Sequence, residues 1–175
     1  PVFAGCVTTG SYTHETSCVT YQGPDSAHAG KEICFNANGP SDRIAIVDVS
    51  NKAAPVTLAS LTYPGSGYPH QGDLSSDHRY RLVNDELDES QFGHNAKTLV
   101  WDVSDLDLPV LVGAHTHALG VIDHNLYVHD NHVYESNYES GFRVLRIDNL
   151  SQAQLTEIAY FDTYPASNAP EFNGN

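Results

Sequence analysis

The sequence contains no methionine, one tryptophan, and only 8 lysines and arginines against 22 acidic residues. The formal net charge of −14 argues against a nucleic acid partner, because the phosphates would be repelled. Such a charge favours cations, basic surfaces or simple solvation. No stretch of 18 apolar residues is present, so we expect no membrane span. The absence of a leading methionine and of a signal peptide leads us to expect a mature or trimmed product.

Long helical patterns are also lacking. The nearest candidate covers residues 152–161, but its last four residues, Ile158 to Phe161, fit a strand at least as well. Elsewhere, short runs rich in Val, Ile, Leu and Tyr are bounded by Gly, Pro, Asn, Asp and Ser, which is typical of β-strands and their turns. The sequence therefore predicts an all-β fold.

The common catalytic motifs are missing as well. The sequence has no Gly-x-Ser-x-Gly elbow, no Gly-x-Gly-x-x-Gly and no P-loop, and Gly65-Ser66-Gly67 reads as a turn. We therefore assign no catalytic residues from sequence, and nucleotide binding has no support.

Cysteine is scarce, with three residues in the chain. Cys18 and Cys34 fall on two predicted strands of one unit, which favours a cross-strand disulfide and an oxidising, extracellular setting. Cys6 is then left free or pairs elsewhere. The alternative is three reduced thiols in the cytosol, but the Cys-x-x-Cys spacing of a zinc site is absent. Asn149-Leu150-Ser151 is a sequon, so Asn149 is a candidate glycosylation site.

An internal repeat is the strongest positive signal. His14, His70 and His124 are 56 and 54 residues apart, and each stands between a short polar lead-in and a strand-like run. A period of this length is typical of repeat architectures, and four short strands per unit favour propeller blades. We expect a β-propeller-like array of about three blades, with units at about 12–66, 67–120 and 121–172. Closed propellers use four to eight blades, so we expect part of a larger or incomplete propeller.

Other pieces repeat with the histidine. Asp48 and Asp102 each begin an Asp-x-Ser turn and are 54 residues apart. A third copy at Phe142–Asp148 is degenerate, with Arg146 at the position of the aspartate.

The core of these units, Leu99-Val100-Trp101-Asp102-Val103-Ser104, resembles the LVIVD repeat. Longer segments resemble the choice-of-anchor B domain built from such repeats, and together they cover the chain from about Tyr12 to Phe172. These segments are residues 23–35, 68–72, 84–89, 123–127 and 160–165. The resemblance implies a secreted or surface-attached propeller-like domain with no established catalytic activity. It also implies a further apolar strand after residue 175, so we expect a fragment.

The repeated histidines are candidate metal ligands. If the blades place equivalent residues around one axis, the three rings approach one another and hold a transition metal ion. Carboxylates from the loops between strands would complete the set. The candidate metal residues are His14, His70, His124, Asp85, Glu86 and Glu139. The alternative is that each histidine only caps the entry to its blade. More than roughly 6 Å between the ligating nitrogens would rule out a shared ion.

Two weaker patterns also point to cations. The acidic loop from Asn84 to Glu89 offers hard oxygen ligands for calcium but lacks the EF-hand spacing, and a solvated loop is an equal alternative. His115 and His117 share one face if they lie on a strand, although two histidines at a polar strand edge are the simpler interpretation.

Tyrosines and asparagines near the repeated histidines suggest a ligand-binding face. Tyrosine offers a large flat contact with a polar tip, but it is also a favoured strand residue. The candidate ligand-binding residues are Tyr68, Tyr127, Asn84 and Asn137. We expect a secreted or surface module that binds protein or carbohydrate or self-assembles, with calcium or a transition metal as its cofactor. The alternative is a metal-dependent hydrolase with the three histidines as ligands and Glu86 as base.

Overall fold

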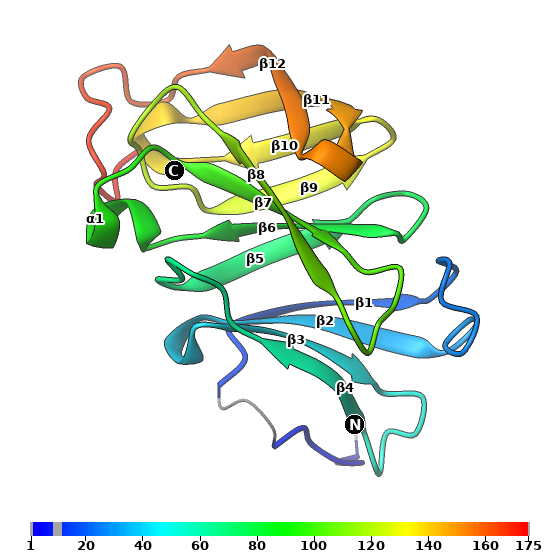
Figure 1. Cartoon of the computed structure of the whole chain (residues 1–175). Helices are drawn as coiled ribbons and strands as arrows, with labels where there is room; N and C mark the ends of the chain where they lie inside the picture. The colour runs from blue at the N-terminus through cyan, green and yellow to red at the C-terminus, as the bar shows by residue number, and fades with distance from the viewer. Residues whose placement is uncertain (1, 9–11, 175) are drawn as a thin grey trace.

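The computed structural model describes residues 2–8 and 12–174, which form three four-stranded antiparallel sheets. In each sheet, strands that follow one another along the chain lie side by side (Figure 1). The first sheet contains β1 (Glu15–Thr20), β2 (Glu32–Asn38), β3 (Arg43–Asp48) and β4 (Val56–Leu61). The second contains β5 (Pro69–Leu74), β6 (Tyr80–Asp85), β7 (Lys97–Asp102) and β8 (Val110–Thr116). The third contains β9 (Asn125–His129), β10 (His132–Ser136), β11 (Phe142–Asn149) and β12 (Gln154–Phe161).

Helical structure is confined to short turns between strands. The single α-helix among the described residues, α1 (Asp88–Phe92), lies in the acidic loop after β6. It ends at Gly93, whose left-handed backbone (φ 71°) is one that glycine adopts without strain. The 3₁₀ turns are η1 (Gly39–Ser41), η2 (Tyr138–Ser140) and η3 (Leu150–Gln152). The all-β prediction is confirmed, and residues 154–161 are a strand.

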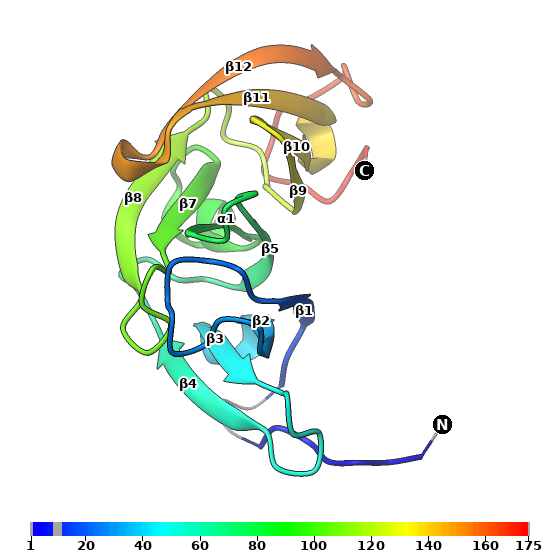
Figure 2. The same cartoon turned by 90° about the vertical axis from the view of Figure 1, so that its right-hand side faces the viewer.

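The sheets fan out along an open arc (Figure 2). The first strand of each sheet, β1, β5 and β9, lies on the concave side, and the last strands lie on the convex side. Strand β5 contacts both β1 and β9. Residues at the start of these three strands are therefore neighbours in space although they are far apart in sequence.

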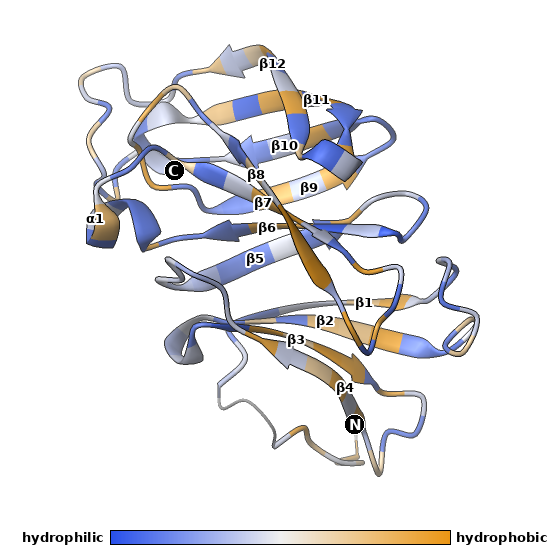
Figure 3. Ribbon diagram, in the orientation of Figure 1, coloured by the Kyte–Doolittle hydropathy of each residue, from blue (hydrophilic) through white to orange (hydrophobic). Residues whose placement is uncertain are grey.

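Two apolar layers hold the sheets together. Side chains alternate between the faces of a strand, so the uninterrupted apolar run of β7 supplies both layers. Leu99 and Trp101 pack toward the first sheet, whereas Val100 packs toward the third. Figure 3 shows the hydrophobic colour running along β2 and β3, which complete the first layer. The central sheet is thus buried on both faces.

Arg81 ties the second sheet to the first. Its side chain is 1% exposed. The guanidinium donates to the backbone carbonyls of Phe35 (3.1 Å) and Asn36 (3.2 Å) on β2. A buried guanidinium is tolerated only where its hydrogen bonds are made.

The Asp-x-Ser turns form as predicted in the first two sheets but not in the third. Asp48 and Asp102 accept hydrogen bonds from the backbone N–H of Ser50 (3.0 Å) and Ser104 (2.9 Å). In the third sheet Asn149 has this role, accepting from the N–H of Ser151 at 3.0 Å. The placement of this turn at Arg146 was wrong, because β11 is eight residues long and its pairing with β12 contains two register shifts.

The predicted disulfide between Cys18 and Cys34 is present, and the two residues are directly opposed on β1 and β2. Cys6 is a free, exposed cysteine. Among the described residues, no helix has the length and apolar character needed to cross a bilayer.

Candidate metal centre

The three repeated histidines form one column on the concave side of the arc. His14 precedes β1, His70 lies in β5, and His124 precedes β9. The ring centroids of His14 and His70 are 4.3 Å apart, and those of His70 and His124 are also 4.3 Å apart. The sequence repeat thus brings these residues together, as the period of the units predicted.

Glu86 faces two of these rings. Its Oε2 lies 3.7 Å from Nε2 of His70, and its Oε1 lies 3.6 Å from Nε2 of His124. One ligand atom from each of the three residues lies within 4.8 Å of the other two. Tyr138 donates its hydroxyl to Oε1 at 2.7 Å and fixes the carboxylate. Two imidazoles and one carboxylate are a ligand set that zinc and related ions accept.

The hydrogen bond on the other side of His70 sets its tautomer. Nδ1 lies 3.2 Å from the backbone carbonyl oxygen of His124 and donates to it. A neutral ring then carries a lone pair on Nε2, which points toward the Glu86 carboxylate. Burial lowers the pKa of His70 to about 4, and the charges of His124 and His14 add to this against the opposing effect of Glu86. The ring is therefore neutral at pH 7, which is the form that binds metals.

His14 stands at the end of the column. Its Nδ1 is 3.2 Å from the hydroxyl of Tyr68, and the two rings meet edge to face with centroids 5.2 Å apart. His14 therefore extends the imidazole surface next to His70 but is outside the group with Glu86.

The other two predicted carboxylate ligands face different partners. Asp85 accepts hydrogen bonds from the Tyr63 hydroxyl (2.6 Å) and from the backbone N–H groups of Gly67 and Tyr68. Glu139 accepts from the Ala169 N–H (2.7 Å) and from the side chain of Asn173 (2.8 Å). These bonds anchor loops and turn both carboxylates to partners other than the histidine column.

The predicted ligand-binding residues are scattered. Tyr68 contacts His14, whereas Tyr127 lies on β9 and is 61% exposed. Asn84 is fully buried, and neither of its amide atoms has a hydrogen-bond partner. Asn137 donates to Glu135 (2.8 Å) and accepts from the backbone N–H of His124 (3.3 Å). The four residues do not form one surface.

Asn149, the candidate glycosylation site, is only partly exposed. Its Oδ1 accepts from both the N–H and the hydroxyl of Ser151, so the sequon coincides with a structural turn.

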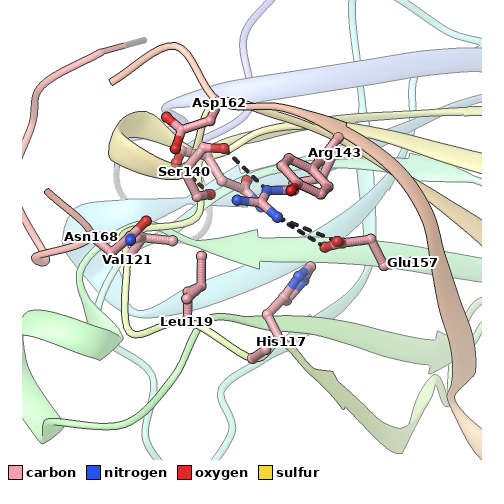
Figure 4. A pocket seen from close by; sticks show the side chains of 11 residues that line it. His117, Leu119, Val121, Ser140, Arg143, Glu157, Asp162 and Asn168 are labelled. Atoms are coloured by element: carbon pink, nitrogen blue, oxygen red, sulfur yellow. Dashed lines mark hydrogen bonds and ion pairs between the residues drawn. The ribbon is translucent and has the colours of Figure 1, made fainter. Parts of the chain in front are cut away.

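A groove of about 320 Å³ lies between the segment that follows β8 and the third sheet (Figure 4). Arg143 donates to the Ser140 carbonyl (3.1 Å) and to Glu157 (3.3 Å), and it lies over the Tyr160 ring at 4.8 Å. His117 borders the groove opposite them. The groove combines a flat aromatic edge with fixed polar groups.

His117 is engaged on its inner side. Its Nε2 is 3.0 Å from the Thr98 hydroxyl and 3.3 Å from Glu135, and its ring meets that of His115 edge to face at 5.0 Å. His117 therefore forms a buried network with Thr98 and Glu135, and the half-buried ring of His115 packs against it.

Sequence reasoning missed the roles of Arg143 and Glu135. Arg143 meets Glu157 and Tyr160 through the pairing of β11 with β12. Glu135 meets Thr98 and His117 only because the second and third sheets pack together, which no local spacing signals. Tyr138 follows the repeated asparagine, Asn137, but the sequence does not indicate that its hydroxyl orients Glu86.

No family model matches the chain, and no curated protein matches it. Solved structures share its fold at low sequence identity. A Lactobacillus plantarum protein is 18% identical with a TM-score of 0.60, covering 77% of this chain and 40% of its own. A functionally unknown protein from Desulfotomaculum acetoxidans is 10% identical with a TM-score of 0.60, covering 89% of this chain and 45% of its own. The periplasmic gluconolactonase of Pseudomonas aeruginosa is 17% identical with a TM-score of 0.62, covering 87% of this chain and 41% of its own. The chain thus spans less than half the length of the solved proteins it resembles.

Proposed function

We propose that this chain is an extracytoplasmic binding module whose recognition face is organised around a transition metal ion held by His70, His124 and Glu86. One observation carries the proposal: the Nε2 lone pair of the neutral His70 ring and a carboxylate oxygen of Glu86 face each other at 3.7 Å. A divalent ion between these groups replaces a repulsive contact by two bonds. The disulfide supports an oxidising compartment.

Three protein ligands leave one position open on a tetrahedral ion. A donor from a partner protein or a glycan hydroxyl would fill it, which makes ligand binding metal-dependent. The groove in which Arg143 lies over Tyr160 is a second surface that would contact such a ligand.

Metal titration tests this proposal. Calorimetry with Zn²⁺, and the visible spectrum of the Co²⁺-loaded protein, should reveal one site per chain. His70→Ala and Glu86→Gln should each weaken binding at least about tenfold, since second-shell changes alone cost that much. His129→Ala is the matched control, because that ring lies at the exposed end of β9 with a side chain 78% exposed. An equal loss in the control, or no binding by the wild type at micromolar Zn²⁺, would overturn the proposal.

A metal-dependent hydrolase is the second candidate. The open position favours it, because a water bound there would be activated as a nucleophile. Glu86 would then be a ligand, so a base other than Glu86 would be needed. The zinc-loaded protein should be assayed on lactones, esters and phosphoesters, with His124→Ala as the inactive comparison. Turnover that survives this substitution would exclude the site as its source.

We further propose that the three sheets are consecutive blades of a larger propeller of the choice-of-anchor B type. Apolar side chains on β12 support this: Ile158 is 48% and Phe161 69% exposed. A further blade packed there would cover them. In its absence we expect self-association, so Ile158→Lys should shift sedimentation toward the monomer. A wild type that stays monomeric at all concentrations would count against self-assembly.

A further inference from the structure

A second cluster of ionisable groups lies where the second and third sheets meet. Asp88 and Glu89 come from α1, and Asp123 comes from the segment that enters β9. Asp88 and Glu89 are each 2% exposed and Asp123 is fully buried. The Glu89 carboxyl lies within hydrogen-bonding reach of both Asp88 and Asp123. The Nε2 atom of His94 lies 3.6 Å from Asp88, at the outer side of the cluster.

Four oxygens of this cluster lack donors, whereas Oδ2 of Asp123 accepts from the backbone N–H of Lys97 at 3.3 Å. Oδ1 of Asp88, Oδ1 of Asp123 and both carboxylate oxygens of Glu89 are buried without a hydrogen-bond partner. Buried carboxylates without donors are strongly destabilising, because they lose their hydration without compensation. Such a group persists in a fold only when something else neutralises it.

Asn84 provides an independent observation. It pairs with Gln71 of β5 and lies one residue beyond the part of β6 that pairs with β7. It is in line with Thr98 of β7, whose hydroxyl donates to Glu135 at 2.6 Å. By strand alternation it shares a face with Leu82, which packs against the third sheet. The Asn84 side chain is 0% exposed, and neither of its amide atoms has a hydrogen-bond partner. Asn84 therefore lies on the face of β6 that packs toward the third sheet, and both of its amide atoms are without a partner there.

Little positive charge offsets the cluster. The charge of Lys97 acts on Asp88, while Asp85 and Glu135 add negative charge around Asp123. Burial, followed by the neighbouring carboxyls, raises the pKa of Asp88 to about 9 and also raises that of Asp123. Protons shared among the carboxyls are therefore the alternative to a bound cation.

We propose that Asp88, Glu89 and Asp123 bind a calcium ion, with the amide oxygen of Asn84 as a further ligand. The donors are hard oxygens, which calcium prefers and which differ from the imidazole-rich set around Glu86. The ion joins α1 to the entry of β9 and so fixes the segment that carries Glu86. This site is independent of the proposed transition metal centre, and either can exist without the other.

Calcium binding to the full chain, stripped of metal with a chelator, tests the inference. Calorimetry should give one Ca²⁺ per chain, and Ca²⁺ should raise the thermal midpoint because it binds only the folded state. Asp123→Asn and Glu89→Gln should each weaken Ca²⁺ binding at least about tenfold. Asp130→Asn is the matched control, because that carboxylate is 85% exposed at the end of β9.

A second readout separates a cation site from a network of shared protons. With a cation site, Asp123→Asn removes repulsion and should raise the thermal midpoint in chelator while abolishing the shift by Ca²⁺. His70→Ala should leave Ca²⁺ binding intact, which separates failure of this inference from failure of the transition metal site. No heat and no thermal shift for the wild type at 1 mM Ca²⁺, on the order of the weakest extracellular calcium sites, would overturn the inference without recourse to any variant.

Discussion

Removal of the disulfide tests how the first sheet is stabilised. Cys18 and Cys34 are separated by 16 residues and are directly opposed on β1 and β2, so the bond closes the hairpin loop between them. In the chain-entropy treatment, a loop of this length restricts the unfolded chain by about 3 kcal/mol. Cys18→Ala combined with Cys34→Ala should therefore lower the free energy of unfolding by about 3 kcal/mol. For a chain of this size, that corresponds to a fall of about 6–12 °C in the thermal midpoint.

Urea unfolding followed by circular dichroism measures this loss. Cys6→Ala is the matched control, because Cys6 is free and exposed, and we expect it to change stability by less than about 0.5 kcal/mol. Wild type in reductant should behave like the double variant. A loss below about 1 kcal/mol would refute the reasoning, because the hairpin would then already be restricted in the unfolded chain.

Three further predictions concern the packing of the sheets and one turn. Arg81→Met removes both hydrogen bonds from the buried guanidinium to the carbonyls of β2 and should cost about 2–4 kcal/mol in urea unfolding. Leu82→Ala opens a cavity between the second and third sheets and should cost about 2–5 kcal/mol by the same measurement. Burial opposes ionisation of Asp102, but the bonds from Ser104 and Arg79 outweigh it and lower its pKa. Its ionised form thus stabilises the fold above about pH 4, and this stability is lost as the pH falls through the lowered pKa. Thermal midpoints between pH 5 and pH 2 should fall less in Asp102→Asn than in the wild type, whereas an equal fall would contradict the assignment.

Local patterns were enough to predict most of the fold. The short apolar runs, the turn residues and the paired cysteines all act over a few residues, and the structure contains the strands and the bond that they predicted. The third Asx turn was misplaced because β11 contains irregular pairing with β12. A register shift of this kind depends on how two strands meet, which no local spacing records.

The candidate site was predictable only in part. The repeat was sufficient to place the histidines together, because equivalent positions of stacked units become neighbours. It could not decide between the adjacent Asp85 and Glu86. Strand β6 ends at Asp85, so side-chain alternation no longer determines direction beyond it. In the structure Asp85 turns to the loop before β5 and Glu86 turns to the histidines.

The residue that follows the second strand of each sheet explains why the proposed metal centre occurs once in a repeated architecture. Each unit carries a polar residue there, followed by a variable one: Gly39 after Asn38 in the first unit, Glu86 in the second, and Tyr138 in the third. Gly39 leaves room for the ring of Tyr68, which a side chain at that position would meet. Tyr138 instead donates its hydroxyl to Glu86. The architecture therefore supplies the imidazoles three times, and the differences among the units place one carboxylate where two of them converge. Functional residues are therefore expected where the three units differ, because the packing of the sheets is enough to explain the residues that the units share.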